Sequence, residues 1–389
     1  MSFYDGYTFF AFLLIFVVIA IILGIREKSM KFYLFAVSWF FIFATISSAS
    51  QLLWMLIFIA MQLYTVKIYV WLRKKYGRVE WIYYHAIFFA ILPLILNKLI
   101  HFLPFRSFLI IGISYVTFRT VQIIIELYDG VMEDVNTFET LTFLIFFPSL
   151  SSGPIDRSRR FSEDFNCVRK RADYLELAGK GLEKILLGAV YKFVISALVY
   201  NLVTRFSPDL NLAHNAFYAY SYGVYMFFDF AGYSLMAIGT GYCFGILVPE
   251  NFNKPFLSLD IKEFWDRWHI SLSHWFRDFI FSRFMMKAIR GKWFKKRLNG
   301  ASVGFIVNML VMGLWHGVCL EYILYGLYHG ILLAITERYQ KKSKFYKAHK
   351  NQLWFKSVSW FITINLVMFG FYIFSGRFTA YLSLLLVSL

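Results

Sequence analysis

The stretch GYTFFAFLLIFVVIAIILGI, residues 6–25, contains no charged side chain. A helix needs about 20 apolar residues to cross the hydrocarbon core of a bilayer, so this stretch is long enough for one crossing. A second uncharged run, residues 32–66, follows after a short basic segment. A water-soluble core could not enclose runs of this length, and the sequence therefore predicts a chain that folds in a membrane.

The composition of the 389-residue chain leads to the same conclusion. Hydrophobic residues make up 59%, mean hydropathy is +0.58, and only 16% of the residues are charged, against about 25% in soluble domains. An ordinary soluble enzyme is therefore excluded. The net charge of +17 comes from basic residues that cluster between the apolar runs, which is typical of membrane topology. We expect the lipid bilayer as a partner, and no nucleic acid.

The charges beside the apolar runs predict the orientation of the chain. Asp5 precedes the first run, and Arg26 and Lys28 follow it, so the positive-inside rule places the N-terminus outside. The loops 283–297 and 338–356 are basic and contain no acidic residue, which places them inside. We predict an all-α polytopic membrane protein with about ten or eleven transmembrane helices plus re-entrant or interfacial helices. The expected spans are residues 6–25, 32–46, 52–72, 81–100, 107–127, 185–204, 214–248, 301–320, 322–336 and 357–374.

The apolar segment 137–154 is expected to enter the membrane and return. Both of its flanks look cytoplasmic, and Pro148 together with the stretch 149–154 breaks a helix. Irregular backbone at membrane depth is tolerated only against protein or a water-filled cavity. The segment therefore suggests a cavity.

Ionisable side chains inside membrane spans are costly, and each is a functional candidate by default. The candidates are Arg119, Glu126, Lys192, Asp229, His316 and His329. A structural Arg119–Glu126 pair and a snorkelling Lys192 are favoured, and Asp229 is expected to bond to Tyr233 one turn later.

His316 stands between Gly313 and Gly317, which would leave one helix face open for a ligand to approach the ring. A neutral imidazole is the usual general base. From these residues alone, a functional His316 and a buried structural one are equally supported.

The densest polar stretch, residues 263–278, is too charged to span the membrane. As an interfacial helix it would embed its aromatic side chains and direct Asp266, Arg267 and His269 toward water or a cavity floor. His269 and His274 are five residues apart, a poor spacing for a shared metal, and the three cysteines form no CxxC pair. We expect no metal site.

Several blocks of this sequence resemble the membrane-bound O-acyltransferase family, and within it the branch that D-alanylates teichoic acids of Gram-positive cell walls. The blocks are GISYVTFR (residues 112–119), SGPIDR (152–157), FDFAGYS (228–234), NFNKPF (251–256), FWDRWHISLS (264–273) and GLWHG (313–317). The last two are specific to the family in combination.

The resemblance implies one membrane domain over residues 1–389, with helices around a central funnel or tunnel. Its parts would be N-terminal helices (1–110), a catalytic core (111–337) and C-terminal helices (338–389). The catalytic histidine would be His316, acting as base, and the second family histidine His269, which would position the thioester arm or polarise its carbonyl. The further substrate-binding or tunnel residues would be Trp265, Asp266, Arg267, Asn308, Trp315 and Asp229.

The resemblance also implies the reactants and partners. The donor would be D-alanine held as a thioester on the phosphopantetheine of a small acidic carrier protein in the cytosol, and the chain itself would bind no cofactor. The acceptor hydroxyl outside would belong to lipoteichoic acid or to an intermediate, and further membrane proteins of the pathway could take part. A basic, partly apolar surface would dock the carrier, and its residues are Arg283, Phe284, Met285, Met286, Lys287 and Arg290.

Two alternatives remain open. The polysaccharide O-acetyltransferase branch shares the histidine blocks but uses another acyl donor. A transporter would explain buried charges and a cavity without bond making. The D-alanyl branch would place the protein in the plasma membrane of a Gram-positive bacterium.

Overall fold

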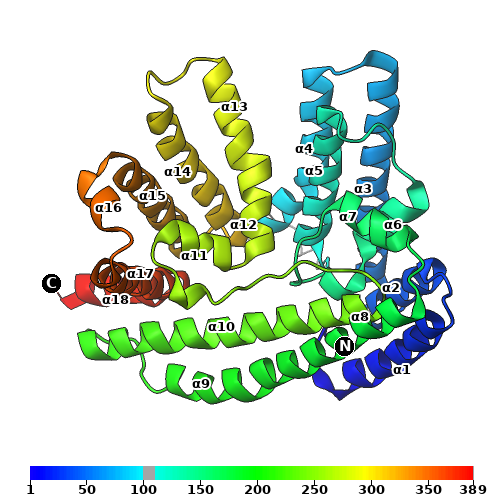
Figure 1. The fold of residues 1–389 in the computed structure, drawn as a ribbon, viewed down its shortest axis with the longest axis horizontal. Coiled ribbons are helices and arrows are strands. Elements are labelled where there is room, and N and C mark those ends of the chain that lie inside the picture. Colours follow the sequence, from blue (N-terminus) through cyan, green and yellow to red (C-terminus); the bar gives the residue numbers. More distant parts are fainter. Residues whose placement is uncertain (100–109, 389) are drawn as a thin grey trace. The chain divides into compact units, whose positions relative to one another are not determined.

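The structure, a computed structural model, describes residues 1–99 and 110–388 and is built from helices throughout these ranges (Figure 1). No strand occurs in them, and two isolated bridges are the only β-type pairing there. The contacts divide the chain into two compact units, Met1–Ala189 with Gly232–Glu250 and Val190–Ala231 with Asn251–Leu389. We describe each unit by itself.

The first unit contains the N-terminal helices. They are α1 (Gly6–Ile25), α2 (Lys31–Thr45), α3 (Ala49–Tyr76), α4 (Glu80–Leu99), α5 (Ile113–Asp129), α6 (Thr137–Ile145), α7 (Ser158–Asn166) and α8 (Arg171–Ala189). The final residues of α10 (Leu212–Cys243) also belong to it. The beginning of the span expected at residues 107–127 lies outside the described residues.

The second unit contains the first part of α10 and the C-terminal helices. They are α9 (Ser196–Val203), α11 (Ile261–Arg267), α12 (Ile270–Phe276), α13 (Ser282–Arg290), α14 (Arg297–His316), α15 (Leu320–Lys342), α16 (Lys344–His349), α17 (Leu353–Phe374) and α18 (Arg377–Ser388). π-Helical turns, Val190–Ile195 and Arg277–Phe281, precede α9 and α13.

Six of the described helices are long and apolar enough to cross a membrane: Gly6–Ile25, Ala49–Tyr76, Glu80–Leu99, Arg171–Val203, Arg297–His316 and Leu353–Phe374. The helices Lys31–Thr45 and Arg377–Val387 are apolar but shorter. The all-α polytopic membrane fold predicted from the sequence is therefore confirmed.

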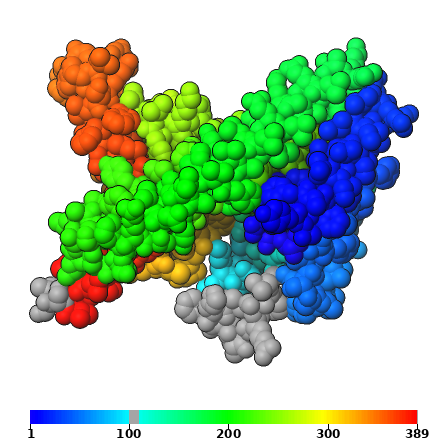
Figure 2. Space-filling view, turned by 90° about the horizontal axis from the view of Figure 1, so that it is seen from below, coloured from blue at the N-terminus to red at the C-terminus, as the bar shows by residue number. Residues whose placement is uncertain are grey.

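Glycines allow the helices of the first unit to approach closely. In Figure 2, α1 (blue) lies beside the green segment that contains α8. A Cβ on Gly24 of α1 would overlap the ring of Tyr174 on α8, and this tyrosine donates a hydrogen bond to the carbonyl of Cys243 (2.7 Å). A Cβ on Gly181 would lie 2.7 Å from the Gly239 carbonyl oxygen. Small residues at such contacts are what helix packing in lipid requires, where no hydrophobic force draws helices together.

The segment predicted to re-enter is short and buried. α6 has nine residues and advances about 14 Å, too little to cross a core of about 30 Å. Arg119, which is fully buried, donates hydrogen bonds to the carbonyls of Phe143 (2.7 Å), Leu144 (3.0 Å) and Ser149 (2.9 Å). The end of a helix leaves carbonyl groups without partners, and the guanidinium supplies donors there, although Phe143 also accepts from the amide of Phe146 (3.3 Å).

The predicted Arg119–Glu126 pair is wrong. Glu126 instead accepts a hydrogen bond from the hydroxyl of Ser158 (2.9 Å). Seven helical positions separate the two residues, and the backbone carbonyls after α6 lie closer to the guanidinium than the carboxylate does. Both residues still connect elements of the first unit.

The second unit is centred on the α14–α15 hairpin, whose helices lie side by side (Figure 1). A Cβ on Gly313 would lie 2.3 Å from the Tyr322 carbonyl oxygen, and one on Gly326 would lie 2.5 Å from the Met309 carbonyl oxygen. The two backbones are therefore almost in contact. This close packing fixes the end of α14, where His316 is the last residue.

Candidate active site

His316 lies in an aromatic surround at the C-terminal end of α14. The centroid of its ring is 4.5 Å from that of Trp315, 5.0 Å from that of Phe374 and 5.8 Å from that of Tyr322. The side chain is partly exposed. An imidazole with aromatic walls and an accessible side suits proton transfer to a bound reactant.

The two glycines beside His316 do not leave an open face, contrary to the expectation from the sequence. A Cβ on Gly317 would lie 2.7 Å from the ring of Tyr322, and Gly313 meets the backbone of the same residue. The glycines are required because α15 packs against them. Access to His316 therefore comes from another side of the ring.

His269 forms the turn between α11 and α12, and its backbone is in the left-handed region, with φ 44° and ψ 52°. This conformation is unfavourable for a residue with a Cβ, and it persists only where the surroundings impose it. Here the amide of Asn253 donates to the Arg267 carbonyl (3.0 Å), and the amide of Ile270 donates to the Asn251 carbonyl (2.9 Å). The loop 251–253 thus holds both sides of the turn.

The side chain of Asn251 completes this support. It is fully buried, and its Oδ1 accepts a hydrogen bond from the hydroxyl of Ser271 (2.7 Å). In the sequence, Asn251 stands out only as part of the block NFNKPF (residues 251–256), with no role of its own. The residue type is the signal that could have revealed this role, because asparagine is frequent in tight turns.

The imidazole of His269 is buried, and one of its nitrogens has no hydrogen-bond partner among the described residues. The side chain is 4% exposed and packs edge-on against Phe230, with ring centroids 4.6 Å apart. Among the described residues, its Nε2 has no hydrogen-bond partner. Burial, with a smaller contribution from the nearby His316, lowers the pKa of His269 to about 3. The ring is therefore neutral at physiological pH, and the electrostatic interaction places the two histidines near each other.

A pocket of about 220 Å³ collects three of the predicted site residues, Trp265, Asp266 and Asn308. Its other lining residues are Lys262, Ser273, Arg277, Phe281, Phe305, Met309, Met312 and Leu333. Met312 and Asn308 are one and two turns before His316 on the same face of α14, since positions four apart share a face. The pocket therefore runs along the helix that carries the histidine.

The pocket has apolar walls and unsatisfied polar groups. Oδ1 of the buried Asn308 has no hydrogen-bond partner among the described residues. Buried polar atoms are nearly always paired, so an open one at a pocket suggests that a ligand supplies the bond. Asp266 is exposed and lies 3.7 Å from Arg277, which belongs to a π-helical turn. Turns of this kind are frequent at functional sites.

Trp265 is held in place by His329. Its Nε1 donates to His329 Nδ1 (3.3 Å), and the histidine is 1% exposed. A Cβ on Gly370 would lie 2.5 Å from His329 Nε2, so the other edge of the ring is closely packed. His329 is therefore a structural residue that fixes a wall of the pocket.

Three further predicted site residues lie elsewhere. Arg267 pairs with Glu263 (2.6 Å) and does not line the pocket. Asp229 pairs with Lys192 (2.5 Å), which belongs to the π-helical turn Val190–Ile195. The ring of Trp315 packs against that of His316 at an interplanar angle of 58°.

The expected partners of Asp229 and Lys192 were wrong. Tyr233 bonds to the hydroxyl of Ser151 (2.5 Å) rather than to Asp229, and Lys192 forms an ion pair rather than snorkelling. Positions 229 and 233 share a face of α10, but Ser151 and Lys192 supply the partners of the tyrosine and the carboxylate instead.

The residues predicted to dock the carrier protein lie on α13, and one of them faces the interior of the unit. Met285 is 9% exposed and packs near Gly300 of α14, whereas Met286 is 44% exposed and Ile289 is 54% exposed. The exposed apolar side chains of this helix are therefore Met286 and Ile289, and Met285 belongs to the α13–α14 contact. Arg290 is exposed beside them.

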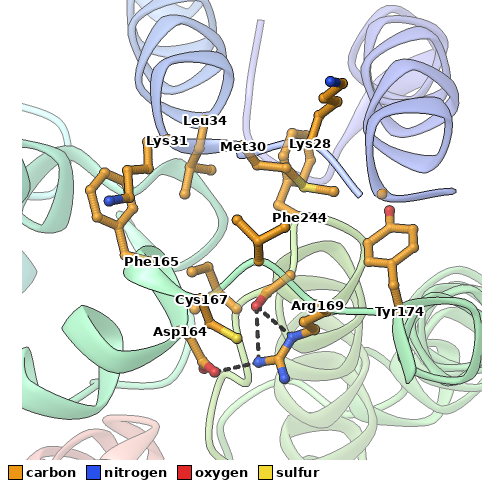
Figure 3. A pocket seen from close by; sticks show the side chains of 14 residues that line it. Lys28, Met30, Lys31, Leu34, Asp164, Phe165, Cys167, Arg169, Tyr174 and Phe244 are labelled. Carbon is orange, nitrogen blue, oxygen red and sulfur yellow. Dashed lines mark hydrogen bonds and ion pairs between the residues drawn. The ribbon is translucent and has the colours of Figure 1, made fainter. Parts of the chain in front are cut away.

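A second pocket, in the first unit, is structural (Figure 3). Arg169 lies between Asp164, with which it forms an ion pair, and the backbone carbonyl of Gly245 (3.3 Å). The volume is about 30 Å³, comparable to one water molecule. Across residues 1–99 and 110–388, no group of three or more His, Cys, Asp or Glu side chains could hold a metal ion.

The model of the membrane-bound O-acyltransferase family matches residues 39–376, which include both histidines and the pocket. The chain belongs to this family. It is therefore an O-acyltransferase, and a multi-pass membrane protein.

Individual relatives show similarity over different lengths. The chain is 39% identical to the teichoic acid D-alanyltransferase of Bacillus subtilis, over 97% of this chain and 98% of the relative. It is also 39% identical to the teichoic acid D-alanyltransferase of Streptococcus thermophilus, over 84% and 83%. With the probable alginate O-acetylase AlgI of Pseudomonas aeruginosa it shares 33% identity, over 69% of this chain and 49% of the relative.

Proposed function

We propose that this enzyme transfers a D-alanyl group to a hydroxyl of teichoic acid. The observation that carries the proposal is the similarity to a teichoic acid D-alanyltransferase over nearly the whole length of both chains. The similarity to alginate O-acetylases covers about half of those proteins. We therefore assign a D-alanyl group, as in the relatives that match over their full length, rather than an acetyl group.

The donor in this proposal is a thioester on the phosphopantetheine arm of an acidic carrier protein, and the acceptor is lipoteichoic acid or an intermediate. The pocket beside α14 is mainly apolar, which suits the chain of such an arm, and Asn308 would bond to one of its amide groups. The exposed Met286, Ile289 and Arg290 on α13 would contact the carrier. The basic loops support a cytoplasmic position for this surface and an N-terminus outside the plasma membrane of a Gram-positive bacterium.

The chemistry follows from the two histidines. Neutral His316 takes the proton from the acceptor hydroxyl as its oxygen attacks the thioester carbonyl carbon. The tetrahedral intermediate carries a negative oxygen, and the proton on Nε2 of neutral His269 forms a hydrogen bond to it. When the intermediate collapses, the C–S bond breaks, and the thiolate takes the proton from His316. The products are a D-alanyl ester and a free thiol, and both histidines are neutral again.

The proposal is tested by reconstitution with carrier protein loaded with radiolabelled D-alanine and with membrane extract as the source of acceptor. Wild-type protein should transfer the label, and His316→Ala should not. His85→Ala is the matched control, because His85 is exposed on α4 and bonds only to a carbonyl in its own helix. This control should retain full transfer.

Each other result contradicts the proposal in a different way. Transfer from an acetyl donor but not from the D-alanyl carrier would identify a polysaccharide O-acetyltransferase. Transfer by His316→Ala within tenfold of wild type would exclude His316 as the base. Ligand movement without any acyl transfer would indicate a transporter.

A further inference from the structure

A pocket of about 530 Å³ lies among α15, α16 and α17, which adjoin one another in Figure 1. Its volume is within the range of small-molecule sites, about 300–1,000 Å³. It shares no lining residue with the pocket beside α14. The proposed acyl transfer therefore does not use this pocket.

One wall of this pocket is an apolar stripe on α17. The stripe consists of Val358, Ile362 and Leu366, which are four residues apart and therefore share a face. Val358 is 49% exposed and Ile362 is 52% exposed. From Trp354 to Leu366 the helix advances about 18 Å, close to half the thickness of a hydrocarbon core of about 30 Å. Because α17 is one of the six candidate spans, a hydrocarbon chain suits this wall and a folded protein does not.

The other end of the pocket is basic. Lys350 and Lys356 line it and are exposed, and neither has a side-chain ion pair or hydrogen bond among the described residues. Tyr346 and Trp354 stand beside them. Aromatic residues with a polar tip are enriched where lipid headgroups meet the hydrocarbon.

The acidic residues of the pocket already have partners. Asp260 accepts from Gln340 Nε2 (2.8 Å) and caps α11 through the amide of Lys262 (2.8 Å). Glu263 pairs with Arg267 (2.6 Å). Asp260 bonds only to neutral donors and keeps its charge, but the two lysines outnumber this one carboxylate. The net charge at this end of the pocket is therefore positive, and its complement is an anion.

We propose that this pocket binds an anionic phospholipid. One acyl chain lies along Val358, Ile362 and Leu366, and the phosphate contacts Lys350 and Lys356. Basic residues next to a membrane helix attract anionic lipids in this way. The lipid is a bound ligand that holds α16 between α15 and α17, and it is not a substrate of acyl transfer.

The experiment measures thermal unfolding of the full-length protein in nanodiscs of phosphatidylcholine, with or without phosphatidylglycerol. Phosphatidylglycerol should raise the Tm of the wild type by several degrees. In Lys350→Gln/Lys356→Gln, most of this increase should disappear. Lys344→Gln/Lys347→Gln is the matched control, because it removes two exposed charges from the same segment outside the pocket, and it should keep the increase.

A second pair of variants tests the apolar wall without changing charge. Ile362→Trp fills the groove, and Phe361→Trp places the same side chain at a neighbouring position that is 63% exposed and outside the pocket. The first should lose the increase in Tm from phosphatidylglycerol and the second should keep it. Unchanged Tm in pure phosphatidylcholine shows that both variants are folded.

Four results would overturn the proposal. Equal losses in the two lysine double variants would indicate general attraction to the membrane surface. Retention of the effect in Ile362→Trp would exclude the groove. Equal stabilisation by soluble glycerol phosphate would indicate a site for a free anion. Weaker capture of the acidic carrier by Lys350→Gln/Lys356→Gln, with an unchanged lipid effect, would identify a protein-docking surface.

Discussion

The segments around Arg119 and His269 both bury an ionisable side chain, but they differ in the hydrogen bonds that they give it. Both terminal nitrogens of Arg119 donate to the backbone between Phe143 and Ser149, and only its Nε has no partner among the described residues. His269 has a strained backbone, and its Nε2 has no partner among the described residues. A buried polar group with partners stabilises a fold, whereas an open one is costly and persists where function requires it. The first segment therefore has a structural role, and the second is the one for which we propose a role in acyl transfer.

The largest effect is expected from Arg119→Met. This change removes a donor from three buried carbonyls, of which Phe143 keeps the amide of Phe146 as a partner, and each carbonyl left unsatisfied costs about 1–3 kcal/mol. We expect little folded protein, measured as the monodisperse fraction in detergent. Arg159→Met in the same unit is the control and should fold normally. A well-folded Arg119→Met protein would contradict the structural role of this turn.

His269→Asn should have the opposite effect to Arg119→Met, with loss of activity and retention of the fold. Asparagine tolerates the left-handed conformation, so the fold should persist, while transfer should fall by about 10²–10³-fold because the oxyanion loses its donor. The measurements are Tm and the rate of label transfer in the same preparation. A loss of both together would show that His269 is structural, like Arg119.

Asn251→Ala should have an intermediate effect. It removes the acceptor for Ser271 and loosens the loop that holds His269, without touching a reactant. We expect transfer to decrease by about tenfold, since small misplacement of a catalytic group is costly. Ser271→Ala should reproduce part of the loss, because it removes the same bond from the other side. Full activity in both variants would show that this bond does not position the histidine.

The smallest expected effect is on the pH dependence of stability. The pKa of His269 is lowered to about 3 in the fold from about 6.5 in the unfolded chain. As pH falls, the unfolded chain therefore takes up this proton before the folded protein does. The contribution of His269 to stability is complete above pH 6.5 and is lost as pH falls toward 3. Between pH 7.5 and 5.5, His269→Asn should lose about 1–2 °C less in Tm than wild type. Identical slopes would show that His269 is not buried in the neutral form.

Much of the fold could be predicted from the sequence because hydropathy and charge are local signals. The uncharged run 6–25 became α1, and Pro148 with its cytoplasmic-looking flanks correctly indicated a short, interrupted segment at α6. The partners of Arg119 could not be predicted, because they are backbone carbonyls of a distant segment, and backbone atoms leave no pattern in a sequence.

The site was predictable in part. Trp265, Asp266 and Asn308 line one pocket. The left-handed turn at His269 could not be predicted, because histidine adopts this backbone at only a small minority of positions. The inward position of Met285 could have been predicted. Met285 and Ala288 are three positions apart and share the buried face of α13, which helical periodicity already indicates.

The most direct test of the account is the single-turnover rate of D-alanyl thioester loss from the carrier in nanodiscs, compared for wild type, His316→Ala and His269→Asn at equal Tm. The account predicts thioester loss coupled to ester formation in wild type. It predicts the absence of both in His316→Ala, and both slowed together by at least a hundredfold in His269→Asn. Wild-type rates in His269→Asn would contradict the central claim that the open nitrogen of this buried histidine acts in acyl transfer.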